Sequence, residues 1–177
     1  MIYADINLYQ HKDSPVETEL SEFDLKILDQ LQNDCSLSSV ELAEKVGLSQ
    51  SPCWRRLQRL REEGYIKKQV AILDRSKFAP IPYIFAYLKM DVLSDSERAD
   101  FIRKVNLIPE IIECHTVFGE MDIMIKVMVY SMDWYQSFIF NTVMKLPGVK
   151  GLQSTVTLGE LKSTTAIPVR KLKLNSA

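Results

Sequence analysis

The chain has 177 residues, enough for one ample domain or two small ones. It is 46% hydrophobic and 25% charged, a balance typical of a globular protein with a substantial core. The formal net charge of −1 does not point to a nucleic-acid partner, and no apolar run is long enough for a transmembrane helix or a signal peptide. We therefore expect a cytoplasmic protein without a membrane partner, whose three irregularly spaced cysteines stay reduced (Cys35, Cys53 and Cys114).

The chain opens with a predicted arm and a predicted helix. Residues 1–20 are acidic, show no clear apolar period and are predicted to form a mobile N-terminal arm. Ser21 then provides a helix N-cap, with acidic residues in the first turn, where the helix dipole favours them. The helix is predicted to run to about Asp34, with Phe23, Ile27, Leu28 and Leu31 along its inner stripe.

Residues 38–64 are predicted to form two short amphipathic helices joined by a Gly-Leu-Ser turn. Ser38 caps the first helix, Gly47 supplies the positive φ that ends it, and Ser49 caps the second. The apolar residues recur at helical spacing, as in a helix-turn-helix, whose second helix can lie in the major groove of DNA. The predicted buried residues are Val40, Leu42, Ala43, Val46, Cys53, Leu57 and Leu60.

The outer face of the second helix suits DNA. Amides and hydroxyls on this face can read base edges, arginines can bind guanine or phosphate, and Trp54 can pack on a thymine methyl or a sugar. Arg56 falls nearer the apolar flank and is predicted to form an ion pair. An ordinary helical hairpin with a basic outer face is the competing interpretation. The predicted DNA contacts here are Ser49, Gln50, Ser51, Trp54, Arg55, Gln58 and Arg59.

The charge is uneven along the chain. Between residues 54 and 77, eight basic residues stand against three acidic ones, a local charge of +5 that is expected of contacts with DNA phosphates. The β character of residues 65–73 predicts a wing, a short hairpin in which Lys67 and Lys68 reach a phosphate strand. We therefore predict a winged helix-turn-helix domain at 21–74, followed by a linker at 75–82 that contains two prolines.

The second half predicts an α+β domain at 83–169 and a C-terminal tail at 170–177. Strand patterns at 83–91, 111–118, 123–129 and 149–158 alternate with two helices, capped by Ser94 and Ser131. The order β-α-β-β-α-β is that of a ferredoxin-like domain. The helix residues expected to face inward are Phe101, Ile102, Val105, Tyr135, Phe138, Ile139, Val143 and Leu146.

Two helices cover only one face of a four-stranded sheet. Apolar strand residues on the other face need another cover, and a second copy of the chain is the simplest. We therefore predict a homodimer through this domain, which also places two recognition helices about one DNA turn apart, ~34 Å. The residues expected on this face include Phe85, Tyr87, Val117 and Ile125.

With both halves in view, the chain resembles the leucine-responsive/asparagine-responsive (Lrp/AsnC) regulators of bacteria and archaea over residues 21–169. The resemblance depends on short motifs in both halves, which are specific in combination. They are DLKIL (24–28), ELAEKVGLS (41–49), SPCWRRL (51–57), EGYI (63–66), GEMD (119–122), LPGV (146–149) and KSTTAIP (162–168).

The resemblance implies a sequence-specific transcriptional regulator that binds double-stranded DNA and assembles as dimers, often as an octamer. It also implies an amino-acid effector, bound in the C-terminal domain near a dimer–dimer contact, and no other cofactor. A zwitterion needs an acceptor for its ammonium and donors for its carboxylate, and the matching region offers both. Alternatively, Gly119 and Asp122 only shape a hairpin. The effector residues carried over by position are Thr116, Val117, Phe118, Gly119, Asp122, Thr155 and Thr157.

Two rival functions fit parts of the pattern. Ferredoxin-like domains also host catalysis, but His115 and Cys114 are adjacent on a strand and point to opposite faces, which is poor geometry for a nucleophile pair. Metal-ligand spacing and a glycine-rich phosphate loop are absent, so we expect neither an enzyme nor a metal site. The second rival is a DNA-architectural protein that needs no effector, which would share every feature except a working pocket.

Overall fold

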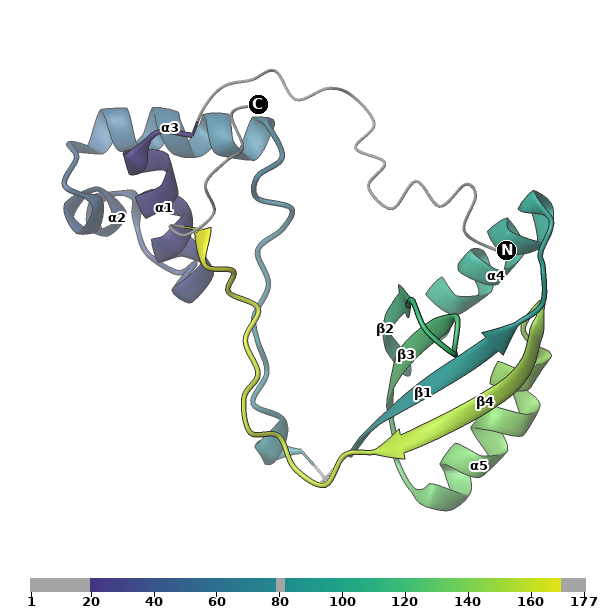
Figure 1. Cartoon of the computed structure of the whole chain (residues 1–177). Helices are drawn as coiled ribbons and strands as arrows, with labels where there is room; N and C mark the ends of the chain where they lie inside the picture. The colour runs from purple at the N-terminus through teal and green to yellow at the C-terminus, as the bar shows by residue number, and fades with distance from the viewer. Residues whose placement is uncertain (1–19, 79–81, 170–177) are drawn as a thin grey trace. The chain divides into compact units, whose positions relative to one another are not determined.

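A computed structural model describes residues 20–78 and 82–169, which form two compact units (Figure 1). One unit contains residues 20–72 and 162–169, and the other contains the described residues from 73 to 161. The predicted arm and tail lie outside the described residues, except for Leu20. Within the described ranges, no helix is long and apolar enough to cross a membrane.

The first unit is a helical bundle whose helices begin at capping boxes. The Ser21 hydroxyl accepts the N–H of Asp24, whose carboxylate accepts the serine N–H in return, and Ser38 makes the same exchange with Glu41. Gly47, at φ 74°, ends the second helix in the left-handed conformation. The helices are α1 (Glu22–Asn33), α2 (Ser39–Val46) and α3 (Gln50–Glu62). As predicted, their core contains Ile27, Leu42, Ala43, Val46, Cys53, Leu57 and Leu60, whereas Val40 is exposed.

The predicted wing hairpin is not formed by the described residues. The N–H of Tyr65 donates to the Leu60 carbonyl at 3.0 Å, and Ile66 packs on the helical core, so α3 ends in a tight turn. Residues 67–73 then run without a paired strand and with exposed side chains. The β pattern in this segment therefore does not lead to a paired strand among the described residues.

The end of the second domain also differs from the prediction. The sequence places it at residue 169, whereas residues 162–169 belong to the helical unit. The side chain of Gln32, on α1, bonds to the main chain of Ile167, and Val169 is buried. Sequence periodicity does not detect this return because it depends on one side-chain amide 135 residues away.

The predicted linker at 75–82 is shorter in the structure. The short helix η1 (Arg75–Lys77) already belongs to the second unit. Arg75 Nη1 lies 3.2 Å from Glu160 Oε2, and the guanidinium lies 3.5 Å from the centroid of the Tyr83 ring. Residues 79–81, which include the first of the two prolines, lie outside the described part of the chain.

The second unit has the predicted βαββαβ order. Its sheet has the order β2-β3-β1-β4, and all neighbouring strands are antiparallel. Figure 1 shows α4 and α5 on the same face of the sheet. The elements are β1 (Tyr83–Met90), α4 (Asp95–Asn106), β2 (Ile111–Thr116), β3 (Ile123–Met128), α5 (Met132–Asn141), η2 (Val143–Lys145) and β4 (Val149–Val156).

Strict alternation along β1 separates the two faces of the sheet. Ile84, Ala86 and Leu88 are fully buried under the helices, whereas Phe85 and Tyr87 are half-buried on the opposite face. The sequence assignment of two other residues was wrong. Ile125 pairs with Ala86 and is fully buried on the helix side, and Ile102 is 53% exposed on α4. Val117 lies one residue beyond the end of β2, and its N–H donates to the Asp122 carbonyl at 3.0 Å.

Candidate DNA-binding and effector sites

The outward face of α3 has the predicted polar composition. Ser49, Gln50, Ser51, Trp54 and Arg55 are exposed, with Trp54 53% exposed despite its size. Gln58 is half-buried, and Lys67 and Lys68 are exposed in the segment after α3. A large exposed indole beside amides, hydroxyls and an arginine is the composition that base-edge and sugar contacts require.

One side chain links the start of α3 to α2. The Gln50 amide donates to the Ser39 hydroxyl at 3.1 Å, across the turn of the helix-turn-helix. Ser49 occupies the N-cap position of α3 but makes no cap hydrogen bond through its side chain. The first N–H groups of α3 therefore remain open toward the side on which an anion such as a DNA phosphate would lie.

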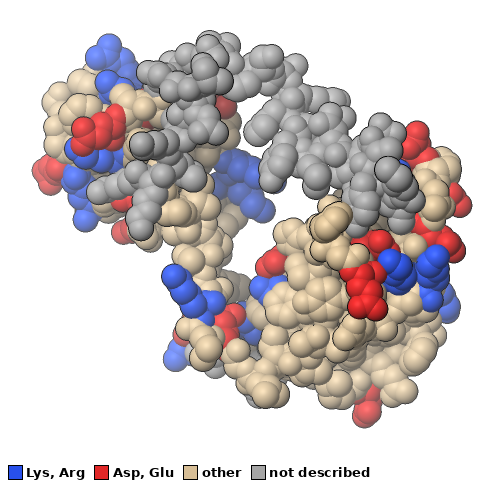
Figure 2. All heavy atoms as spheres, viewed as in Figure 1, with Lys and Arg blue, Asp and Glu red and all other residues tan. Residues whose placement is uncertain are grey.

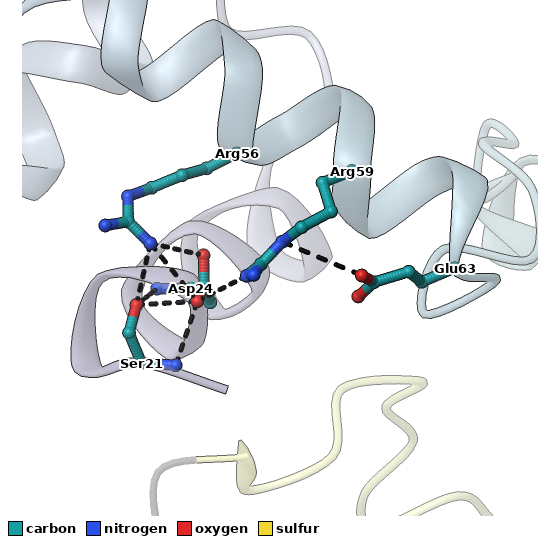
Figure 3. Close-up of polar contacts among 5 residues, drawn as sticks. All are labelled: Ser21, Asp24, Arg56, Arg59 and Glu63. Atoms are coloured by element: carbon teal, nitrogen blue, oxygen red, sulfur yellow. Dashed lines mark hydrogen bonds and ion pairs between the residues drawn. The ribbon is translucent and has the colours of Figure 1, made fainter. Parts of the chain in front are cut away.

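Asp24 fixes α3 against α1. Its carboxylate is completely buried and is reached by two arginines of α3, as Figure 3 shows. Arg56 Nη1 lies 3.1 Å from Asp24 Oδ1, and Arg59 Nη2 lies 2.7 Å from Oδ2. The Ser21 hydroxyl donates to the same carboxylate at 2.6 Å and accepts from Arg56 at 2.9 Å.

These contacts set the charge state of the cluster. Burial alone would raise the pKa of Asp24, but the hydrogen bonds from Ser21 and Arg56 and the nearby charge of Arg59 outweigh it and lower the pKa below its usual value. The carboxylate therefore stays ionised between the two helices. Breaking such a buried pair by removing one partner leaves the other charges without compensation, and this is destabilising.

Arg59 corrects one prediction and Arg56 confirms another. Arg56 forms the expected ion pair, but Arg59, predicted to contact DNA, also points into the Asp24 cluster and lies 3.9 Å from Glu63. Sequence periodicity placed Arg59 near the edge of the outer face and contained no information on a partner in α1. Its guanidinium is held by the carboxylates of Asp24 and Glu63, although the side chain is 33% exposed.

The basic region is accordingly smaller than its sequence count suggests. Arg56, Arg59 and Arg75 are held by carboxylates of the protein itself, which leaves five of the eight basic residues between positions 54 and 77. Figure 2 shows lysine and arginine side chains on the helical unit, interspersed with acidic ones. The basic residues not used in those pairs are Arg55, Arg61, Lys67, Lys68 and Lys77.

The predicted effector residues fall into two groups. At the turn between β2 and β3, Asp122 Oδ2 accepts the N–H of Met90 at 2.9 Å and lies 3.3 Å from the ammonium of Lys89. The N–H of Asp122 donates to the Leu88 carbonyl at 3.0 Å. Asp122 thus ties the turn to the end of β1.

The turn itself projects from the sheet. Phe118 is 93% exposed, and Gly119 has φ 153°, a conformation that is essentially restricted to glycine. Lys89, which the sequence analysis did not select, donates to the Glu120 carbonyl at 2.6 Å and lies beside this turn. Lys89 places a cation near main-chain groups of the turn. In the sequence, the only feature that points to Lys89 is its position one residue before the end of β1.

Thr155 and Thr157 lie at the other end of β1. Thr155 is opposite Phe85, and the Thr157 hydroxyl donates to the Tyr83 carbonyl at 2.6 Å. Leu88 is five positions after Tyr83 along β1, a rise of about 17 Å, and three positions after Phe85, a rise of about 10 Å. One copy of the chain therefore does not bring the two predicted groups together.

A hollow of about 350 Å³ lies elsewhere in this unit, between α5 and the turn that follows α4. Its walls combine the half-buried Trp134 and the buried Phe138, whose rings stack at 4.8 Å, with Ser137 and Asn141. None of the predicted effector residues lines it.

Comparisons with known proteins match both units. A family described as winged helix-turn-helix DNA-binding matches residues 20–67, and the Lrp/AsnC ligand binding domain matches residues 84–167. The transcriptional regulator AzlB of Bacillus subtilis is 32% identical over 153 residues, which cover 86% of this chain and 98% of that protein. The Bkd operon transcriptional regulator of Pseudomonas aeruginosa is 35% identical over 151 residues, which cover 85% and 99%.

The chain belongs to the Lrp/AsnC family. A solved transcriptional regulator of Neisseria meningitidis in complex with L-Met agrees in structure, with a TM-score of 0.80 and 33% identity over 86% of this chain and 98% of that one. The chain is thus a DNA-binding transcriptional regulator, with a helix-turn-helix domain of the winged helix-turn-helix family and a ferredoxin-like Lrp/AsnC ligand-binding domain. The family consists of regulators rather than enzymes.

The Asp24 cluster predicts a dependence of stability on pH. Because the folded-state pKa of Asp24 is lowered, its contribution is present above the unfolded-state pKa of about 3.9 and is lost as the pH falls through the folded-state pKa. Asp24→Asn should lower the free energy of unfolding near neutral pH by about 1–3 kcal/mol. It should also flatten the loss of stability in acid, as measured by urea unfolding at several pH values.

Glu44→Gln is the matched control, since it removes an exposed carboxylate from the same bundle. It should leave the free energy of unfolding nearly unchanged. Equal stabilities for Asp24→Asn and wild type would show that the cluster does not hold α3 in place.

Proposed function

We propose that this Lrp/AsnC regulator reads a twofold DNA site with α3 from each of two chains, and that an amino acid modulates its binding. The observation that supports DNA reading best is the division of the arginines of α3. Arg56 and Arg59 are held by Asp24, whereas Arg55 lies exposed beside Trp54. Because the contacts with Asp24 use Arg56 and Arg59, the outer face of α3 is left free to enter the major groove of DNA, in an orientation that these contacts fix.

We assign base and phosphate contacts within this face by chemistry. Arg55 and Gln58 have the donor geometry to bind guanine and adenine edges bidentately, and Trp54 supplies an apolar surface. Lys67 and Lys68 are suited to the phosphate backbone, which fixes register without reading sequence. Ser49, Gln50 and Ser51, at the start of α3, complete the proposed set.

The assembly proposal depends on the outer face of the sheet. Phe85 and Tyr87 are half-buried there, and Lys126, opposite Phe85, lies 4.5 Å from the centroid of the Tyr83 ring. The ammonium of Lys126 also lies 2.8 Å from the carboxylate of Glu113. Since the charges on this face are already paired, a second copy can cover it without burying a lone charge.

The same assembly completes the effector site. In one chain, Thr155 and Thr157 lie beside Phe85 and Tyr83, whereas the turn that contains Gly119 is tied to Leu88 and Met90 at the other end of β1. A second copy supplies one group while the first supplies the other, so that hydroxyls and main-chain groups converge on the zwitterion. L-Met in the related structure from Neisseria supports an amino acid as the class of effector.

DNA reading predicts a loss on truncation of Arg55. Arg55→Ala should weaken binding to a twofold site, selected in vitro from a random DNA pool, by about 1–3 kcal/mol, because one bidentate contact per half-site is removed. Fluorescence anisotropy measures the affinity. Arg98→Ala, the same change in α4 of the other unit, serves as the control. Equal affinities for Arg55→Ala and wild type would remove α3 from its proposed role.

Effector binding predicts heat on titration with at least one of the proteinogenic L-amino acids. Thr155→Val keeps the side-chain shape but removes the hydroxyl, and should weaken that binding about two- to tenfold, as expected for one net hydrogen bond. Thr165→Val is the control, at another exposed threonine. If calorimetry detects no heat with any of the amino acids while DNA binding is intact, the effector-independent architectural function replaces this proposal.

A further inference from the structure

The chain passes between its two units twice. The first passage is at residues 72–73, after α3, and the second is at residues 161–162, after β4. Each side of the second passage is held by side-chain contacts.

On the helical unit, one amide holds the returning segment. Gln32 Nε2 donates to the Ile167 carbonyl at 2.7 Å, and the Ile167 N–H donates to Gln32 Oε1 at 2.9 Å. The side-chain amide therefore satisfies both main-chain groups of a single residue, as a neighbouring strand would. The second hydrogen of Nε2 is directed to Asp29 at 3.3 Å, and Val169, two residues beyond, is 7% exposed.

On the ligand-binding unit, the same segment is anchored at the start of β1. The Thr157 hydroxyl donates to the carbonyl of Tyr83 and accepts its N–H at 3.2 Å. Glu160 is paired with Arg75, whose guanidinium lies over the Tyr83 ring. Thr157 is also one of the proposed effector residues, so the anchor adjoins the proposed effector site.

The free part of the connection is short. Six residues, 161–166, separate the ion-paired Glu160 from the clamped Ile167. Even fully extended, this length joins the two anchored residues over at most about 25 Å. The end of β4 and α1 are therefore joined by a short connection that has an anchored residue on each side.

We propose that Gln32 is a positioning residue, which clamps the C-terminal segment to α1 and carries the effector signal to the recognition helix. The route runs from Thr157 through Glu160 to Ile167, and then through Gln32 into α1. From α1 it reaches α3 through Asp24, which holds both Arg56 and Arg59. This inference rests on the proposed amino-acid response, and it adds the physical connection between the two functions.

The test measures coupling rather than stability. The affinity for the selected twofold DNA site is measured with and without each proteinogenic L-amino acid, for wild type, Gln32→Ala and Gln32→Glu. For each protein, the ratio of the affinity with amino acid to the affinity without it measures the response. In Gln32→Ala this response should be at least about threefold weaker than in wild type. Gln32→Glu keeps the acceptor for the Ile167 N–H but loses the donor to its carbonyl, and should lie between.

Gln30→Ala is the control, since it makes the same truncation two residues earlier on α1 and should respond as wild type does. Hydrogen exchange of residues 162–169 in Gln32→Ala should be faster than in wild type, which shows directly that the clamp is open. If exchange accelerates but the amino-acid response is unchanged, the clamp proposal is overturned and the proposed function stands. If wild type itself shows no response to any of the amino acids, the proposed modulation of DNA binding is contradicted, and the clamp proposal is contradicted with it.

Discussion

A four-stranded sheet with both of its helices on one face is the constraint on which the rest of this structure depends. The helix side is a complete core, in which Ile84, Leu88, Ile125 and Val127 are fully buried. The opposite side carries half-buried aromatic residues, and uncharged side chains cover much of the face of this unit seen in Figure 2. Because neighbouring side chains already pair the charges of Lys126 and Glu113, a partner surface can cover this side at little electrostatic cost.

The helical unit is under a different constraint. Its small core must hold α3 in a fixed position while one face of α3 stays exposed. Seven buried side chains form its core, and the ionised Asp24 adds a directional link from α1 to α3. Apolar contacts tolerate small rotations, whereas two arginines on one buried carboxylate fix the rotation of α3 about its axis. Such a helix has few base contacts of its own, so pairing two of them is what provides affinity for a specific site.

Much of the fold follows from local pattern. Capping serines at 21, 38, 49, 94 and 131, together with the strand alternation, predict α1 to α5 and the βαββαβ order, because these signals act within a few residues. Short motifs from both halves also predict the family. The exposure of Ser49, Gln50, Ser51, Trp54 and Arg55 follows from helical periodicity alone.

What the sequence could not provide depends on contacts between distant residues. Arg55 and Arg59 look alike in the sequence, and only the position of Asp24 on another helix separates an exposed arginine from a committed one. The strand pattern at 65–73 could not show that no partner strand returns in this unit. Likewise, the resemblance grouped Thr157 with Asp122, although they lie at opposite ends of β1, and no local pattern indicates that Gln32 holds Ile167.

The central claim is that the bare face of the sheet is covered by a second copy, which pairs the DNA-reading helices and completes the effector site. Multi-angle light scattering of the full chain at micromolar concentration tests it most directly. The account predicts a particle of at least twice the 20.4 kDa chain mass, and a smaller particle when Tyr87→Lys places an unpaired charge on that face. A wild-type particle of 20.4 kDa would contradict the account.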